Sequence, residues 1–268
     1  MGKGAAQMTI FRHEVRRGMA SLAIWTAAIA FLLGVCILIY PEMGGQIDEV
    51  GAAFAEMGGF SQAFGMDRVN FGEFSGFFAI ECGNVLGLGG ALFAALAGIS
   101  ALMKEEQGNT AEFLLAHPVS RVRITAEKLC AAAVQVLLLN AVCAAVTAVC
   151  VKSIGEEPPF RTMALLFLAY FLMQLEILAV TFGLSACLRR GGTGAGLGLA
   201  AAFYFMNIIA NLTERAEFLK YFTPFGYADG AKVIAEEALY VKYCASGAVF
   251  AVLGIAFAFW HYRTKEIA

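Results

Sequence analysis

The sequence predicts an all-α integral membrane protein, with six helices across the bilayer and one short cytoplasmic helix between the second and third. Two observations predict this class. Of the 268 residues, 60% are hydrophobic and only 15% are charged, whereas a soluble domain has about 45–50% apolar and about 25% charged residues. The chain also contains six apolar runs long enough to cross a bilayer, which takes about 20 helical residues.

The six predicted spans are residues 19–40, 76–103, 129–151, 163–188, 194–212 and 244–261. Because they occupy most of the chain, we expect one transmembrane domain over residues 1–268. The first span is too long for the apolar region of a secretory signal and lacks a small-residue cleavage motif. The stretch before it, TIFRHEVRRG, is either an interfacial helix or an ordinary basic flank of the first span.

Two connections between spans are predicted to carry short helices of their own. Residues 41–75 include QIDEVGAAFAEM, in which Ile47, Val50, Phe54 and Met57 recur at helical spacing. Residues 213–243 include YADGAKVIAEEALYV, a second such segment. We expect both helices to pack on the outer ends of the spans.

The fifth span begins with GGTGAGLG, a glycine-rich stretch that could suggest a phosphate-binding loop. A Walker loop needs a Lys and a preceding strand, and neither is present in this stretch. The glycines instead favour a sharp helix start and close packing against a neighbouring helix. No ATPase motif or other catalytic motif occurs in the chain, so we do not expect it to be an enzyme.

The basic residues predict the orientation of the spans. Twelve of the 19 Lys and Arg residues lie before the first span, after the last, or in the connections that follow the second and fourth spans. The more basic side of a membrane protein faces the cytoplasm, so both termini are predicted to be cytoplasmic. The formal net charge of −2 argues against a nucleic-acid partner. The seven cysteines lie in or beside apolar runs without a CxxC pair, so neither disulfides nor a metal site is expected.

Four polar residues inside the spans are candidates for a transport path or a helix interface: Asn84, Gln174, Glu176 and Asn207. Glu176 lies near the middle of the fourth span, where a charge costs about 2.5–3.5 kcal/mol on insertion scales. It should therefore face protein or water. It either lines a functional surface or bonds a neighbouring helix through Gln174, Gln135 or Asn140.

The stretch KEEQGNTAEFLLAHPVSR, residues 104–121, is polar but lies between two apolar spans. Asn109 and Glu112 can cap a short helix, Pro118 ends it, and Ser120 caps the next one. Phe113, Leu114 and Leu115 then form an apolar knob with a charged rim, the layout of a docking surface. From the residues alone, an ordinary connection between spans fits as well.

The longer block EEQGNTAEFLLAHPVSRVRITAEK resembles the signature of ABC-2 type permeases, the membrane subunits of ABC exporters. The matching residues are Glu105, Glu106, Gly108, Thr110, Glu112, Leu114, Leu115, Pro118, Val119, Ser120, Arg121 and Lys128. Asn109 is an insertion relative to that pattern. Weaker similarity covers the first external loop, the Arg-Arg-Gly-Gly stretch before the fifth span, and YFTPFGYAD before the sixth.

The resemblance implies that this block is a coupling helix, which inserts into a groove of a separate cytoplasmic ATPase. The implied contact residues are Glu105, Glu106, Thr110, Glu112, Phe113, Leu114, Leu115, His117, Pro118, Ser120 and Arg121. It further implies export across the cell membrane and a second permease copy or homologue. ATP and Mg²⁺ would be bound by the ATPase, with no cofactor in this chain.

Two other functions remain open from the sequence. The chain could be a membrane scaffold or assembly factor that uses the same surface for another soluble partner. It could also be an ion-coupled secondary transporter centred on Glu176, although such a protein is expected to show an internal repeat and none is convincing here.

Overall fold

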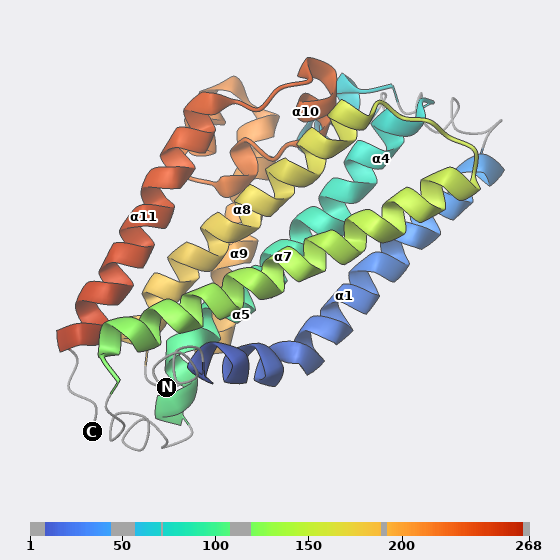
Figure 1. Ribbon diagram of the computed structural model, residues 1–268. Helices are drawn as coiled ribbons and strands as arrows, with labels where there is room; N and C mark the ends of the chain where they lie inside the picture. The colour runs from blue at the N-terminus through green and yellow to red at the C-terminus, as the bar shows by residue number, and fades with distance from the viewer. Residues whose placement is uncertain (1–8, 44–56, 71, 108–118, 189–191, 265–268) are drawn as a thin grey trace.

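The computed structural model describes residues 9–43, 57–70, 72–107, 119–188 and 192–264, and within these ranges it contains helices and no strand. Six helical segments are long and apolar enough to cross a membrane, which confirms the predicted class. The helices begin and end together at two ends of an elongated bundle (Figure 1). We call the end where α1 (Thr9–Met43) begins and α11 (Val241–Thr264) ends the inner end, and the opposite one the outer end.

The second span is built from three helical pieces in one continuous rod. α4 (Phe74–Cys82) leads into η3 (Gly83–Leu88), a π-helical turn, and then into α5 (Gly89–Gln107). The remaining spans are α7 (Arg121–Ser153), α8 (Phe160–Cys187) and α9 (Gly192–Leu212). Widened turns of this kind often mark functional sites. The sequence predicted a single regular helix over residues 76–103 and did not indicate this turn.

Two spans extend further toward the inner end than the sequence predicts. α1 begins at Thr9 rather than at residue 19, and α7 begins at Arg121 rather than at residue 129. The apolar runs marked only the parts that match the hydrocarbon core, whereas the helices continue through the polar flanks. The segment before the first span is therefore part of α1, and Figure 1 shows its first turns bending relative to the rest of the helix.

Short helices cover the outer end. α3 (Gly59–Phe64) and η2 (Met66–Arg68) precede the second span. η4 (Glu214–Tyr221), η5 (Pro224–Gly226) and α10 (Gly230–Glu236) lie between the fifth and sixth spans. α10 confirms the helix predicted in the second external segment. The helix predicted around Ile47, Val50 and Phe54 lies outside the described residues.

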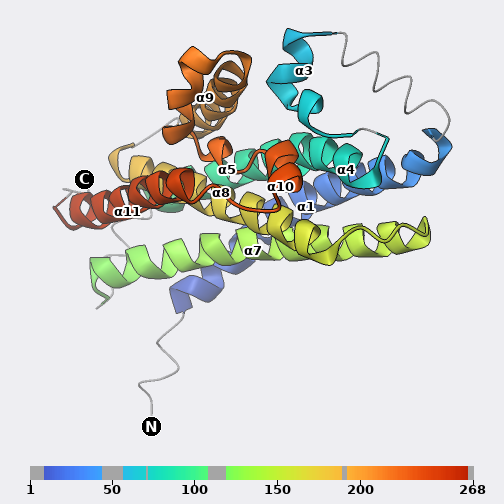
Figure 2. The same cartoon turned by 90° about the horizontal axis from the view of Figure 1, so that it is seen from above.

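The spans differ in how much of their surface the bundle buries. α8 lies at the centre, packed against α5 and α11, while α1 packs along α7. α9 and α11 bury the smallest shares of their apolar stretches, 22% and 17%. Figure 2 shows α9 on one side of the bundle together with α3, and α7 on the opposite side. The open faces of α9 and α11 are therefore left to lipid or to another protein.

The contact between α8 and α11 is close enough to depend on glycine. A Cβ atom added to Gly254 of α11 would lie 2.6 Å from the Ala179 carbonyl oxygen, and one added to Gly183 of α8 would lie 2.7 Å from the Gly254 carbonyl oxygen. Both distances are shorter than any ordinary carbon–oxygen contact. The two backbones therefore touch directly, as small residues allow at membrane-helix interfaces.

Candidate functional site

The predicted coupling segment is described only at its two ends. Thr110, Glu112, Phe113, Leu114, Leu115, His117 and Pro118 lie outside the described residues. Glu105 and Glu106 belong to the last turns of α5. Ser120 and Arg121 begin α7, and the Ser120 hydroxyl accepts a hydrogen bond from the Arg123 backbone N–H at 3.3 Å. The predicted role of Ser120 as a helix cap is confirmed.

Arg121 joins α7 to the last turn of α11. Its Nη1 atom donates to the backbone carbonyls of Tyr262, at 3.2 Å, and of Arg263, at 3.4 Å. The last carbonyls of a helix lack partners within the helix and carry partial negative charge. A guanidinium is therefore well suited to this position, and it fixes the start of α7 to the end of α11.

Two turns further along α7, a buried ion pair joins this helix to two further helices, α1 and α5. Lys128 Nζ of α7 lies 2.9 Å from Glu14 Oε1 of α1 and donates to the Ala101 carbonyl of α5, also at 2.9 Å. The side chains of Lys128 and Glu14 are only 1% and 9% exposed. Separating such a pair would leave a buried charge without compensation, so α1, α5 and α7 are held together at this level.

A second acidic residue fixes the start of α1. Glu127 of α7 accepts from the Phe11 backbone N–H at 3.0 Å and pairs with Arg123 at 2.7 Å, one turn earlier in the same helix. The first N–H groups of a helix have no partner within it. Glu127 thus supplies an acceptor to α1 from a neighbouring span. We call Glu14, Arg121, Arg123, Glu127 and Lys128 the inner network.

Glu176 is buried in α8, as predicted, but its partner differs from those expected. Its Oε2 atom accepts from the Tyr227 hydroxyl at 2.8 Å, just after η5. Gly247 of α11 lies opposite, where a Cβ atom would be 2.1 Å from the same oxygen. Gln174 instead bonds Asn140 of α7 at 2.6 Å and the Leu86 carbonyl of the π-helical turn at 3.2 Å. Glu176 and Gln174 therefore face opposite sides of α8.

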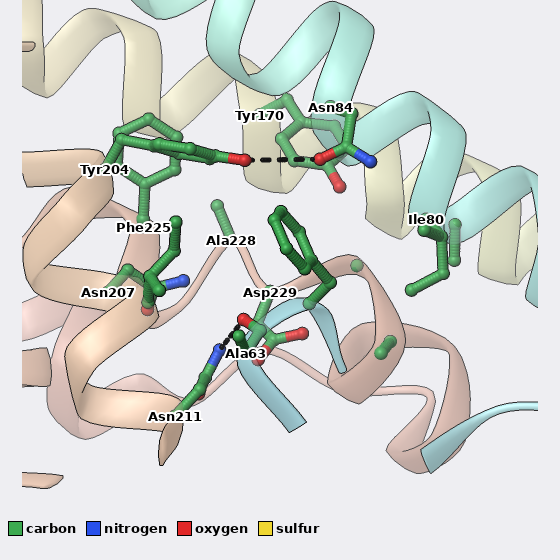
Figure 3. A pocket seen from close by; sticks show the side chains of 16 residues that line it. Ala63, Ile80, Asn84, Tyr170, Tyr204, Asn207, Asn211, Phe225, Ala228 and Asp229 are labelled. Atoms are coloured by element: carbon green, nitrogen blue, oxygen red, sulfur yellow. Dashed lines mark hydrogen bonds between the residues drawn. The ribbon is translucent and has the colours of Figure 1, made fainter. Parts of the chain in front are cut away.

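Asn84 and Asn207, the other two predicted residues, lie in one cavity near the outer end, which Figure 3 shows from close by. The Tyr204 hydroxyl of α9 donates to Asn84 Oδ1 at 3.3 Å, and Asn211 Nδ2 donates to the Ala63 carbonyl at 3.4 Å. The cavity has a volume of about 50 Å³, enough for a few water-sized groups. Its polar lining residues are Asn84, Tyr170, Tyr204, Asn207, Asn211 and Asp229, and we call it the outer pocket.

Comparison with protein families decides what kind of protein carries these features. A family model described as ABC-2 family transporter protein matches residues 8–264, essentially the whole chain. The chain belongs to the ABC-2 transporter family. Among curated proteins, none matches it. The resemblance found around residues 105–128 is thus confirmed over the full length.

As an ABC-2 protein, the chain is a multi-pass membrane permease subunit of an ABC transporter. Members of the family form the membrane component and generally work with ABC ATPase subunits. Within the part of the chain that the structure describes, no three His, Cys, Asp or Glu side chains group in a way that could hold a metal ion.

Sequence reasoning missed several residues of this permease that the structure brings together. Lys128 was noted as a basic residue of the signature, but Glu14 and Glu127 were not singled out. A signal was present, because a Lys predicted to enter a span needs an acidic partner, and few acidic residues flank the inner ends of the spans. Asn211 carried the same signal as Asn207, a polar residue inside the predicted fifth span, whereas Tyr170 and Tyr204 look like ordinary residues of an apolar helix.

Proposed function

We propose that this permease exports its cargo by coupling to a separate cytoplasmic ATPase through residues 104–121. The observation that supports this most directly is the inner network at the two flanks of that segment. α5 ends at one flank and α7 begins at the other, and side chains of α7 tie both helices to α1 and α11. If the ATPase moves the segment between these flanks, the movement would reach α1, α5, α7 and α11 together.

The energetics of the inner network suggest how such movement would spread. Pulling Lys128 away from Glu14 would expose two buried charges to an apolar surrounding, so α1, α5 and α7 would move as one body. Arg121 would carry the same displacement to the end of α11. In this mechanism ATP and Mg²⁺ are bound by the ATPase, both termini of the permease are cytoplasmic, and the protein works in the cell membrane.

The path for the cargo would open between two permease copies, or between this chain and a homologue. α9 and α11 leave most of their apolar surface outside the bundle, so either face is available for such a partner as well as for lipid. Glu176 and the outer pocket would line the path or stabilise the interface between helices. The match to a transporter family argues against the scaffold alternative, while the ion-coupled alternative is tested below.

Co-purification with an ATPase tests the proposal. The native chain is compared with the double variant Leu114→Asp/Leu115→Asp, which places two charges on the predicted apolar knob. A matched control places the same two charges at the outer end, as Phe160→Asp/Phe218→Asp, because these side chains are 86% and 59% exposed. We expect the ATPase to be lost from the inner variant alone.

Two outcomes would contradict the proposal. If the native chain purifies without an ATPase and transports in its absence, ion coupling becomes the better explanation and Glu176 the residue to examine. If the ATPase remains bound to the Leu114→Asp/Leu115→Asp variant, the contact lies elsewhere on the chain.

A further inference from the structure

The outer pocket contains polar oxygen atoms that the described part of the chain leaves without a hydrogen bond. The Tyr170 hydroxyl, Asn207 Oδ1 and Asn211 Oδ1 are buried and have no hydrogen-bond partner among the described residues. Tyr170 is only 1% exposed, and Figure 3 shows it beside Asn84 at one side of the pocket, with Asn207 and Asn211 on α9. Buried polar atoms in folded proteins nearly always bond either protein or water, so three unbonded oxygens in one cavity call for water or a ligand there.

The hydrogen bonds already formed decide which kind of group this ligand must present. Asn211 uses its Nδ2 atom to donate to the Ala63 carbonyl, so its Oδ1 atom remains as an acceptor. Asn207 contributes a second side-chain carbonyl one helical turn earlier on the same face of α9. A hydroxyl, Tyr170, completes the set, and it can donate or accept. The pocket therefore suits a ligand that donates hydrogen bonds.

A larger hollow adjoins the outer pocket, and Asn211 lines both. The hollow has a volume of about 480 Å³, within the range of small-molecule sites. The outer pocket alone holds only a group the size of a hydroxyl or hydroxymethyl. A ligand that reaches past Asn211, the lining residue that the two spaces share, would place its body in the hollow and one polar group in the outer pocket.

The charges around these spaces balance. The hollow is lined by two basic residues, Arg68 and Arg215, and two acidic ones, Asp67 and Glu214. Asp229, the one carboxylate in the outer pocket, is paired with Arg68 at 3.3 Å. With Lys220, whose charge also acts on Asp229, three basic side chains stand against three acidic ones around the two spaces. Donors on the ligand are therefore hydroxyl groups rather than an ammonium.

A nearby lysine adds to the case against a cationic ligand. Lys220 of η4 is buried, and burial, followed by its contact with Lys232, lowers the pKa of its ammonium group, with Asp229 acting in the opposite direction. Positive charge is thus already crowded around Asp229 at this end of the bundle. A further cation in the outer pocket would be repelled by Arg68 and Lys220.

We propose that the outer pocket and the adjoining hollow bind a neutral hydroxylated ligand, a polyol or a sugar, through Tyr170, Asn207 and Asn211. Such ligands present several hydroxyl groups that donate to amide oxygens, and the Tyr204 and Phe225 rings beside the pocket supply apolar surface. The site goes beyond the proposed coupling to an ATPase, because binding at the outer end needs no ATP.

Direct binding to the purified full-length chain tests this. The chain is placed in phosphatidylcholine nanodiscs without any ATPase, and saturation-transfer NMR is titrated with myo-inositol, with maltose and with tetramethylammonium. We expect saturable transfer to at least one of the two hydroxylated probes and none to the cation. Since no ATPase is present, failure here would leave the proposed function untouched.

Variants assign the binding to this site. Tyr170→Phe/Asn207→Leu removes two of the three unbonded oxygens, and the loss of two hydrogen bonds should weaken binding about tenfold or more. Thr147→Val is the matched control, because Thr147 Oγ1 is also buried without a described partner but lies away from this pocket, on α7. If the double variant unfolds, Tyr170→Phe alone is titrated instead. The Tyr170 hydroxyl bonds no described residue, so its removal should leave the fold intact.

Three results would overturn the proposal. Binding of tetramethylammonium in place of the hydroxylated probes would show that the site takes cations. Equal affinity in the native chain and the double variant would place the polyol elsewhere. No transfer to any probe would mean that water alone satisfies the three oxygens.

Discussion

At the inner end, Lys128 and Glu14 are buried as a bonded pair, whereas at the outer end Tyr170, Asn207 and Asn211 bury oxygen atoms that form no hydrogen bond with a described residue. Full charges are expensive to bury and must be compensated within the fold. Neutral polar groups cost less, so a few can remain available. The difference teaches that the inner end compensates its buried groups within the fold, whereas the outer end holds polar atoms that we propose a ligand satisfies.

Lys128→Met should give the largest effect. It leaves the Glu14 carboxylate buried without its partner, which costs about 3–5 kcal/mol. The unfolding midpoint in detergent measures this loss. Lys128→Met/Glu14→Gln removes both charges and should recover a large part of the stability. A single variant no worse than the double one would show that the pair does not hold the inner end together.

Tyr227→Phe should have the next largest effect on the unfolding midpoint. It removes a buried hydrogen bond to Glu176, which lies between the inner network and the outer pocket. The carboxyl group would lose the hydroxyl that donates to it at 2.8 Å, at a cost of about 1–3 kcal/mol. Tyr240→Phe is the control, since its hydroxyl bonds Glu236 in a solvent-exposed position. Equal unfolding midpoints for the two variants would show that the Tyr227–Glu176 hydrogen bond does not stabilise the fold.

A smaller, pH-dependent effect is expected at Lys220. Its pKa is lowered to about 8, chiefly by burial, while an unfolded lysine has a pKa of about 10.4. Between these values the unfolded chain binds more protons, so this residue makes stability rise with pH. Lys220→Met should therefore be more stable than the native chain near pH 7, with an advantage that shrinks toward pH 10. A constant difference between the two midpoints would contradict the lowered pKa.

Tyr170→Phe should have the smallest effect on stability, within about 0.5 kcal/mol of the native chain, because the hydroxyl makes no bond to a described residue that could be lost. The same change should weaken polyol binding. A loss of stability like that of Tyr227→Phe would mean that the fold itself depends on the hydroxyl. The outer pocket would then resemble the inner end, where the buried polar groups stabilise the fold.

The sequence predicted the class, the number of spans and the cap at Ser120, because each depends on local composition or spacing. It placed the inner ends of the first and third spans too far along the chain, since hydropathy measures the hydrocarbon core rather than the helix. It also identified Glu176 as a buried residue that needs a partner. Tyr227 could not be found as that partner, because it lies 51 residues later, just after the short helix η5 and outside the predicted spans.

The polar residues of the outer pocket show a different limit. Asn84 and Asn207 were each predicted as candidates, yet nothing in their spacing indicated that they line one cavity. Their convergence depends on how α9 packs against the π-helical turn and on α3, which follows a long connection. The predicted ATPase-contact residues between Glu105 and Arg121 remain predictions, and the proposed co-purification tests them.

The bond between Tyr227 and Glu176 also bears on how the protein is made. A ribosome delivers α8 to the membrane before Tyr227 has been synthesised, and α11, which closes over the same carboxyl group with Gly247, arrives last. Until Tyr227 emerges, the Glu176 carboxyl group therefore lacks the hydroxyl that donates to it in the folded chain. The surroundings of Glu176 are complete only when α11 has been synthesised, and a chain truncated before Tyr227 would keep a carboxyl group in its fourth span without this partner.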